Sequence, residues 1–208
     1  MTPREHKEFE EKLKNEAIER ASDWSISLQR SESEREKSRF ILSHCLETME
    51  DFKLKQSDIP LIIRLAENPE YLTSRLFTRA VDLFTHDCIH ALLGRGLLLK
   101  DEAFVIGYTM GSEKRMSNFK KILFLFACRY LYPEGYRFYK EERSVFNKAL
   151  EMGRECPTNL TEVDFKNYLE RPLSETRAEL GIDTEAINKY YQEEKELFPN
   201  SKESQRLL

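Results

Sequence analysis

Apolar residues recur every three or four positions along most of the chain, which is the period of a helix with one buried face. Alternation typical of a strand lasts only a few residues around Trp24. Because residues 116–132 are apolar almost all round, we expect them to form a central helix. The pattern predicts an all-α protein with helices over residues 2–21, 34–52, 57–67, 73–93, 116–132, 143–154 and 184–197, and shorter helices ending near 170 and beginning at 172.

The length of 208 residues suits one domain with helical extensions, because such a chain buries about 70% of its unfolded surface. We expect a single-domain multi-helix bundle over residues 57–183. Residues 1–56 would form a charged helical N-terminal extension, and residues 184–208 an exposed C-terminal helix with a frayed tail. Within the bundle, Gly107 and Gly111 lie four residues apart, so another helix can approach them closely.

The composition of the chain indicates its cellular compartment and argues against some classes of protein. A net charge of −4 argues against a general nucleic-acid-binding protein. Four cysteines without a C-x-x-C pair indicate reduced thiols in a cytoplasm-like compartment. The first residues contain several acids and no apolar signal core, so we expect a protein that is not secreted. The longest apolar run, 122–128, is far below the roughly 20 residues of a membrane-spanning helix, which predicts a soluble or peripheral protein.

Two of the four histidines, His86 and His90, lie four residues apart. On a helix they are separated by only about 40° around the axis, so both imidazoles can bind one divalent cation. Asp87 points roughly 100° away from His86, either as a third ligand or as a carboxylate that orients an imidazole. Gly94 ends the helix, and Glu102, on the second arm of a helical hairpin, would face the histidines.

Alternatives remain for each of these side chains. Histidines at this spacing also occur in ordinary packing, although polar ligands inside an apolar helix are costly unless something satisfies them. Arg75 and Arg79 could contact a phosphate or carboxylate of a ligand, but we favour pairing with surface carboxylates. Tyr130 belongs to an aromatic cluster that is either ordinary core or a surface for an isoprenoid or a membrane. We favour a hydrogen-bonded helix histidine over a metal ligand for His44.

The spacing H-D-x-x-H, eleven residues, then Glu, over His86 to Glu102, resembles the signature of the coenzyme Q (ubiquinone) biosynthesis protein four (Coq-four) family. A second stretch, R-P-L-S-E-T-R-A-E-L-G-I over residues 171–182, resembles the closing motif of that family. The resemblance covers roughly residues 70–183. The segment before His86 matches loosely, and Asp101 stands where the family usually has glycine. The chain therefore resembles a divergent member, in which Asp101 could compete as a metal ligand.

The resemblance implies a divalent metal held by His86, Asp87, His90 and Glu102, with zinc first and manganese, iron or magnesium open. It implies action on a polyprenylated aromatic quinone precursor, with decarboxylation and hydroxylation of the ring, a lyase-type activity. Glu102 or Asp101 would shuttle a proton. The resemblance further implies peripheral contact with an inner membrane and other enzymes of quinone biosynthesis as partners. The oligomeric state stays open, with a homodimer as one option. Small residues in the later helix, Ala149 and Gly153, would approach the metal-binding helix.

Two rival functions stay open. In the first, the metal is structural and the protein is a non-catalytic scaffold that binds an isoprenoid lipid; a closed site of four protein ligands would favour it. In the second, the protein is an H-D-type phosphohydrolase. That function requires His44 and a later acid such as Asp164 beside His86 and Asp87 at the metal.

Overall fold

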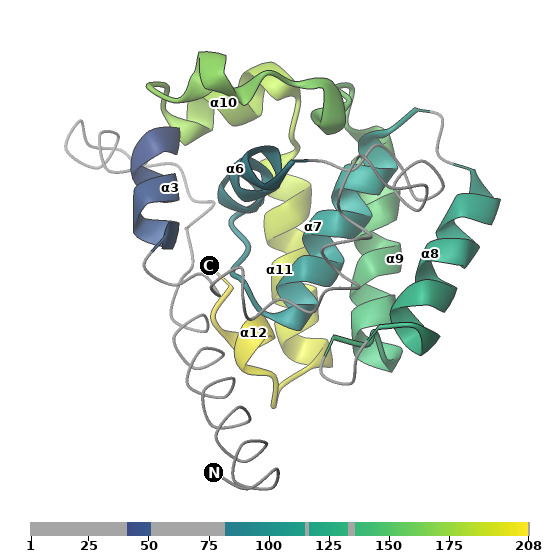
Figure 1. The fold of residues 1–208 in the computed structure, drawn as a ribbon. Coiled ribbons are helices and arrows are strands. Elements are labelled where there is room, and N and C mark those ends of the chain that lie inside the picture. Colours follow the sequence, from purple (N-terminus) through teal and green to yellow (C-terminus); the bar gives the residue numbers. More distant parts are fainter. Residues whose placement is uncertain (1–40, 51–81, 115–116, 133–135, 208) are drawn as a thin grey trace, which may run out of the picture.

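The computed structural model describes residues 41–50, 82–114, 117–132 and 136–207. Within these ranges the chain forms helices and no strand, which confirms the all-α prediction (Figure 1). The helices predicted over 2–21 and 57–67 lie outside the described residues. The α-helices are α3 (Leu42–Glu50), α6 (Leu83–Leu93), α7 (Leu99–Ser112), α8 (Asn118–Tyr130), α9 (Lys140–Glu155), α10 (Leu173–Leu180), α11 (Thr184–Leu197) and α12 (Lys202–Gln205), with 3₁₀ turns at Leu160–Glu162 and Phe165–Tyr168.

α6 lies in the centre of the bundle, against α3, α7 and α10 (Figure 1). Eight of its eleven residues are buried. It begins at Leu83, where the Asp82 carboxylate accepts hydrogen bonds from the Thr85 backbone nitrogen at 3.0 Å and the Thr85 hydroxyl at 2.9 Å. A side chain that caps the first turn in this way sets the start of a helix. Residues 73–81 of the expected helix lie outside the described residues.

α7 and α9 pack with their backbones in close contact. A Cβ atom added at Gly107 would lie 2.5 Å from the Phe146 carbonyl oxygen, and one at Gly111 or Gly153 would also clash with the backbone of the opposite helix. The predicted close approach at Gly107 and Gly111 is therefore confirmed. Ala149 and Gly153 approach α7, which carries Glu102, whereas the expected target was the helix of His86 and His90.

α8 lies at the edge of the molecule, which contradicts the central position expected from its apolar sequence (Figure 1). One face packs into a second apolar cluster, where the Phe124 ring stacks on Phe146 at 5.3 Å. The opposite face is also apolar but exposed. Its side chains are 52–71% exposed: Phe119, Ile122, Phe126 and Tyr130. No helix among the described residues is long and apolar enough to cross a membrane.

The C-terminal residues belong to the main core, in contrast to the exposed helix and frayed tail that we expected. α11 buries one face, with Ile187 and Tyr191 fully covered. Beyond it, α12 buries Ser204, and Leu207 is 1% exposed. The acidic composition of α11 concealed this face, because most of its charged side chains lie on the exposed side of the helix, and Glu194 is the buried exception.

Candidate metal centre

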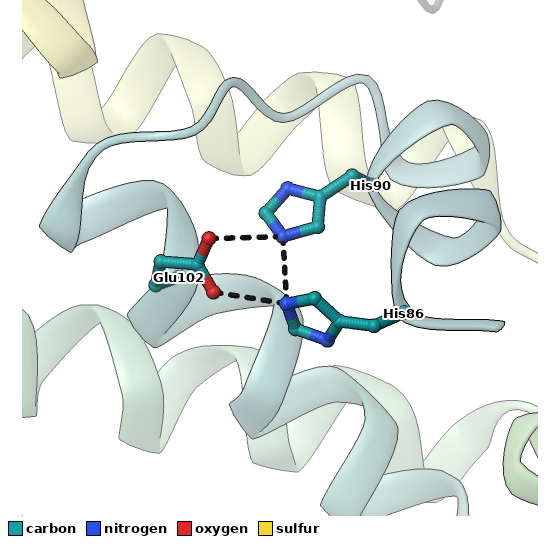
Figure 2. A group of neighbouring side chains, drawn as sticks. All are labelled: His86, His90 and Glu102. Carbon is teal, nitrogen blue, oxygen red and sulfur yellow. Dashed lines mark hydrogen bonds and ion pairs between the residues drawn. The ribbon is translucent and has the colours of Figure 1, made fainter. Parts of the chain in front are cut away.

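Three side chains converge between α6 and α7. Figure 2 shows the imidazoles of His86 and His90 reaching from α6 toward the Glu102 carboxylate in the first turn of α7. The two Nε2 atoms lie 3.0 Å apart, His86 Nε2 lies 3.0 Å from Glu102 Oε2, and His90 Nε2 lies 3.2 Å from Glu102 Oε1. One ligand atom from each residue lies within 4.8 Å of the others, as binding to a single ion requires.

The hairpin between the two helices brings Glu102 to the histidines. Gly94 ends α6 in the left-handed conformation, with φ of 66°, which glycine adopts without steric cost. The Arg95 backbone nitrogen donates to the His90 carbonyl at 3.1 Å, which closes the turn. The Glu102 backbone nitrogen then donates to the Leu98 carbonyl at 2.9 Å in the first turn of α7. The backbone of this hairpin thus brings the three side chains to the same end of the two helices.

A hydrogen bond determines which nitrogen of His90 can bind a metal. Its Nδ1 lies 2.7 Å from the Gly96 carbonyl oxygen, which can only accept, so Nδ1 carries the proton. In the neutral ring, Nε2 then carries the lone pair and points at Glu102. His90 is wholly buried, whereas the His86 side chain is 25% exposed and that of Glu102 31% exposed. The site is therefore reached from solvent on the side of His86 and Glu102.

The electrostatics favour a cation. Burial by itself would raise the pKa of the Glu102 carboxyl, but His90 and His86, through their charges and hydrogen bonds, hold this pKa well below its usual range. Glu102 is therefore ionised at neutral pH. Converging lone pairs on two nitrogens and a carboxylate repel one another unless a proton or a cation lies between them. The donor set fits one divalent ion, since two imidazoles and a carboxylate also hold zinc in open catalytic sites.

The other two acids of the predicted site are not part of this cluster. Asp87 is buried on α6 but does not join the three converging residues, as its position around the helix explains. Asp101 is wholly buried and accepts the Leu98 backbone N–H at 3.0 Å. It also pairs with Arg206 and lies 3.6 Å from Arg95. These partners occupy Asp101, so the structure corrects its expected roles as competing ligand and proton shuttle.

The remaining candidate residues lie elsewhere. His44 is exposed on α3, 3.7 Å from Glu47, and Asp164 caps a 3₁₀ turn by accepting the Lys166 backbone N–H. Neither joins the cluster, so the described residues do not assemble the phosphohydrolase site. Tyr130 is an exposed residue of α8. This helix lies on the far side of α7 and α9 from α6 (Figure 1). Arg75 and Arg79 lie outside the described residues, so the predictions for them stay predictions.

Side chains far along the chain cap the end of α6, and sequence reasoning did not find this role. Arg177 donates from Nε to the Leu92 carbonyl at 2.7 Å and from Nη2 to the Ala91 carbonyl at 3.1 Å. The Tyr191 hydroxyl donates to the Leu93 carbonyl at 2.6 Å. Burial lowers the pKa of Arg177 to about 10. The only sequence signal was the position of Arg177 in the closing motif, which gives no partner.

Comparison with known proteins gives no match among family models, curated proteins or solved structures. The case for a metal centre rests on the geometry and chemistry of His86, His90 and Glu102.

Proposed function

We propose that the protein binds one divalent metal ion through His86, His90 and Glu102 and acts on, or binds, a polyprenylated aromatic quinone precursor. The observation that carries the proposal is the convergence of two Nε2 atoms and a carboxylate within bonding reach of one ion. Zinc is the first candidate for this ligand set, with manganese, iron and magnesium open.

The ligand set favours an enzyme over a scaffold with a structural metal. Structural zinc sites are usually closed by four protein ligands, whereas catalytic ones use three and leave a position for water or substrate. The described residues bring three ligands together. When bound, the ion would act as a Lewis acid on a substrate oxygen or generate a nucleophilic hydroxide from water.

The protein side chains have distinct tasks in this reaction. The bond from His90 Nδ1 to the Gly96 carbonyl keeps its ring fixed, so Nε2 is held ready as a ligand. Glu102 directs Oε1 toward His90 and Oε2 toward His86. With one of these oxygens engaged as a ligand, the other can accept a proton from the substrate. Since Asp101 is occupied elsewhere, Glu102 is the candidate for this proton transfer.

The resemblance to the Coq-four family supplies the substrate class, namely a prenylated aromatic ring that is decarboxylated and hydroxylated. The two motifs of this family, residues 86–102 and 171–182, are far apart in the sequence, yet both contribute to α6 or its C-terminal end. His86 and His90 lie on this helix, and Arg177 of the second motif donates to the carbonyls at its C-terminal end. A shared structural task for both motifs supports the family relationship.

The exposed face of α8 supports peripheral membrane contact, which a prenylated substrate requires. Phe119, Ile122, Phe126 and Tyr130 form its apolar stripe. The helix also carries three basic residues, Lys120, Lys121 and Arg129, and no acid, although the whole chain has a net charge of −4. An apolar face combined with positive charge is typical of helices that lie on anionic lipid.

Elemental analysis of the purified protein tests the metal site. We expect stoichiometric metal in the wild type, its loss in the His86→Ala/His90→Ala double variant, and its retention in the control His44→Ala. Mass spectrometry of lipid extracted from the wild type should reveal a prenylated aromatic compound. Equal metal in the double variant, or none in the wild type, would reduce the histidine pair to a packing feature.

A further inference from the structure

The loop between α6 and α7 is tied to the C-terminal part of the chain by buried charges. The Arg95 guanidinium is wholly buried and forms a two-bond pair with Glu194 of α11, in which Nη1 lies 3.1 Å from Oε1 and Nη2 contacts Oε2. It lies between the rings of Phe104 and Tyr191, at 4.2 and 4.4 Å from their centroids. The Ser204 hydroxyl of α12 donates to Glu194 at 2.9 Å. Contacts of Arg95 with α7 and α11 thus hold the loop that carries Gly96 in place.

A second buried pair fixes the start of α7. Asp101 precedes Glu102, and its Oδ2 accepts the Leu98 backbone N–H, which is one of the donors a helix start leaves unpaired. The same Oδ2 contacts Nη2 of Arg206, 105 residues further along the chain. The Glu102 backbone nitrogen donates to the Leu98 carbonyl. Leu98 therefore anchors both the Asp101 side chain and the Glu102 backbone.

We propose that Arg206 is a positioning residue for Glu102, acting through Asp101 to hold the first turn of α7 where the Glu102 carboxylate faces His86 and His90. This inference rests on the proposed metal site. It adds a role for Arg206, which is not among the three candidate ligands but determines where one of them lies.

The physical basis is the cost of an unpaired buried charge. Asp101 is wholly buried and Arg206 is its closest cation, while Arg95 lies 3.6 Å away and is paired mainly with Glu194. Without Arg206, Asp101 is left with incomplete compensation, and the first turn of α7 must shift or take up a proton or water. The histidines have separate supports, namely the Gly96 carbonyl for His90 and the Arg177 and Tyr191 caps for α6. Loss of Arg206 should therefore displace one ligand of three.

Cobalt(II) titration of the whole 208-residue chain tests this role, because the visible absorption of the ion reports its ligand geometry. The variants are Arg206→Ala, Arg206→Lys and the matched control Arg171→Ala. Arg171 also pairs with a carboxylate, at 2.6 Å from Glu179, but on the surface. Urea unfolding of each variant measures stability separately. We expect Arg206→Ala to weaken cobalt affinity about tenfold, the low end of effects from groups that orient ligands, and to change the absorption bands.

Arg206→Lys should recover part of the affinity, since it keeps the charge. A double variant with Asp101→Asn should lose no more affinity than Asp101→Asn alone, because Arg206 acts through that carboxylate.

A folded Arg206→Ala protein with wild-type affinity and absorption overturns the positioning role and leaves the metal site intact. An equal loss in Arg171→Ala also overturns it. A wild-type protein that binds no cobalt overturns the proposed metal site and this inference together. Should Arg206→Ala not fold, Arg206→Gln is judged by the same readouts; if neither folds, Arg206 serves the stability of the whole chain and the proposal fails.

Discussion

α6 and α8 are both short, largely apolar helices, yet they occupy opposite environments. α6 buries eight of its eleven residues and contacts α3, α7 and α10, whereas α8 buries four of thirteen and exposes a stripe of aromatic and aliphatic side chains. The polar groups differ as well. Buried Arg177 and Tyr191 bond to the end of α6, and buried Arg95 lies just beyond it. The apolar content of a helix therefore does not tell whether its apolar faces are buried in the core or exposed on the surface.

The largest expected effect is on the free energy of unfolding, and it compares a buried arginine next to α6 with a half-buried arginine on α8. Arg95→Ala leaves Glu194 buried without its main partner, and removing one member of such a pair costs roughly 3–5 kcal/mol in the free energy of unfolding. Arg129→Ala on α8 is the control, because Arg129 is half-buried and, among the described residues, lies over the ring faces of Tyr130 and Tyr139, the latter 4.7 Å away. We expect it to cost under about 1 kcal/mol. Urea unfolding measures both, and equal losses would contradict the comparison.

Two phenylalanines on α8 sharpen the comparison within one helix. Phe124 is 8% exposed and stacks on Phe146, so Phe124→Ala should lower the free energy of unfolding by about 3 kcal/mol. Phe126 is 52% exposed, and Phe126→Ala should change stability by no more than about 0.5 kcal/mol. Chemical denaturation compares the pair. A large loss for Phe126→Ala would show that its face is covered in solution.

Metal should stabilise the α6 side of the molecule. Zinc at a free concentration one hundred times its dissociation constant should raise the free energy of unfolding by about 2.7 kcal/mol, because it binds the folded state. Thermal unfolding with and without zinc detects this shift. The shift should vanish in His90→Ala and persist in His44→Ala and in variants of the α8 face. Acid should abolish it, since binding requires deprotonated imidazoles.

The smallest expected effect concerns the exposed face of α8. The Ile122→Ser/Phe126→Ser variant should bind anionic phospholipid vesicles about tenfold more weakly, a difference of about 1.4 kcal/mol, while its stability stays near that of the wild type. Vesicle co-sedimentation at low and high salt measures the binding. Leu197→Ser is the matched control, because Leu197 is an equally exposed apolar residue on α11. The same loss in both variants, or no binding by the wild type, would argue against lipid contact through α8.

Features set by near neighbours in the chain could be predicted from the sequence. His86 and His90 share a helix face because they are four residues apart, and Gly94 ends that helix in the left-handed turn that places Glu102 opposite them. The approach of α9 to Gly107 likewise follows from helix period and residue size. Each of these depends on backbone geometry within a few turns.

Features set by distant partners could not be predicted. Asp101 looked equivalent to Glu102 as a candidate acid, but Arg206, 105 residues away, pairs with it. Glu194 looked like one more surface acid of α11, yet it is wholly buried against Arg95. In both cases a charged side chain can be buried because it pairs with an arginine far away in the sequence. The periodicity of apolar residues does not identify that partner.

The close contact between α7 and α9 limits which amino-acid substitutions the protein can accept during evolution. Any replacement of Gly107, Gly111 or Gly153 adds at least a methyl group where the opposite backbone already lies, so the two helices must separate. Because α7 carries Glu102 in its first turn, such a mutation would also move a candidate metal ligand. If the proposed metal centre is maintained, all three glycines are therefore expected to be maintained too, although none of them is among the three candidate ligands.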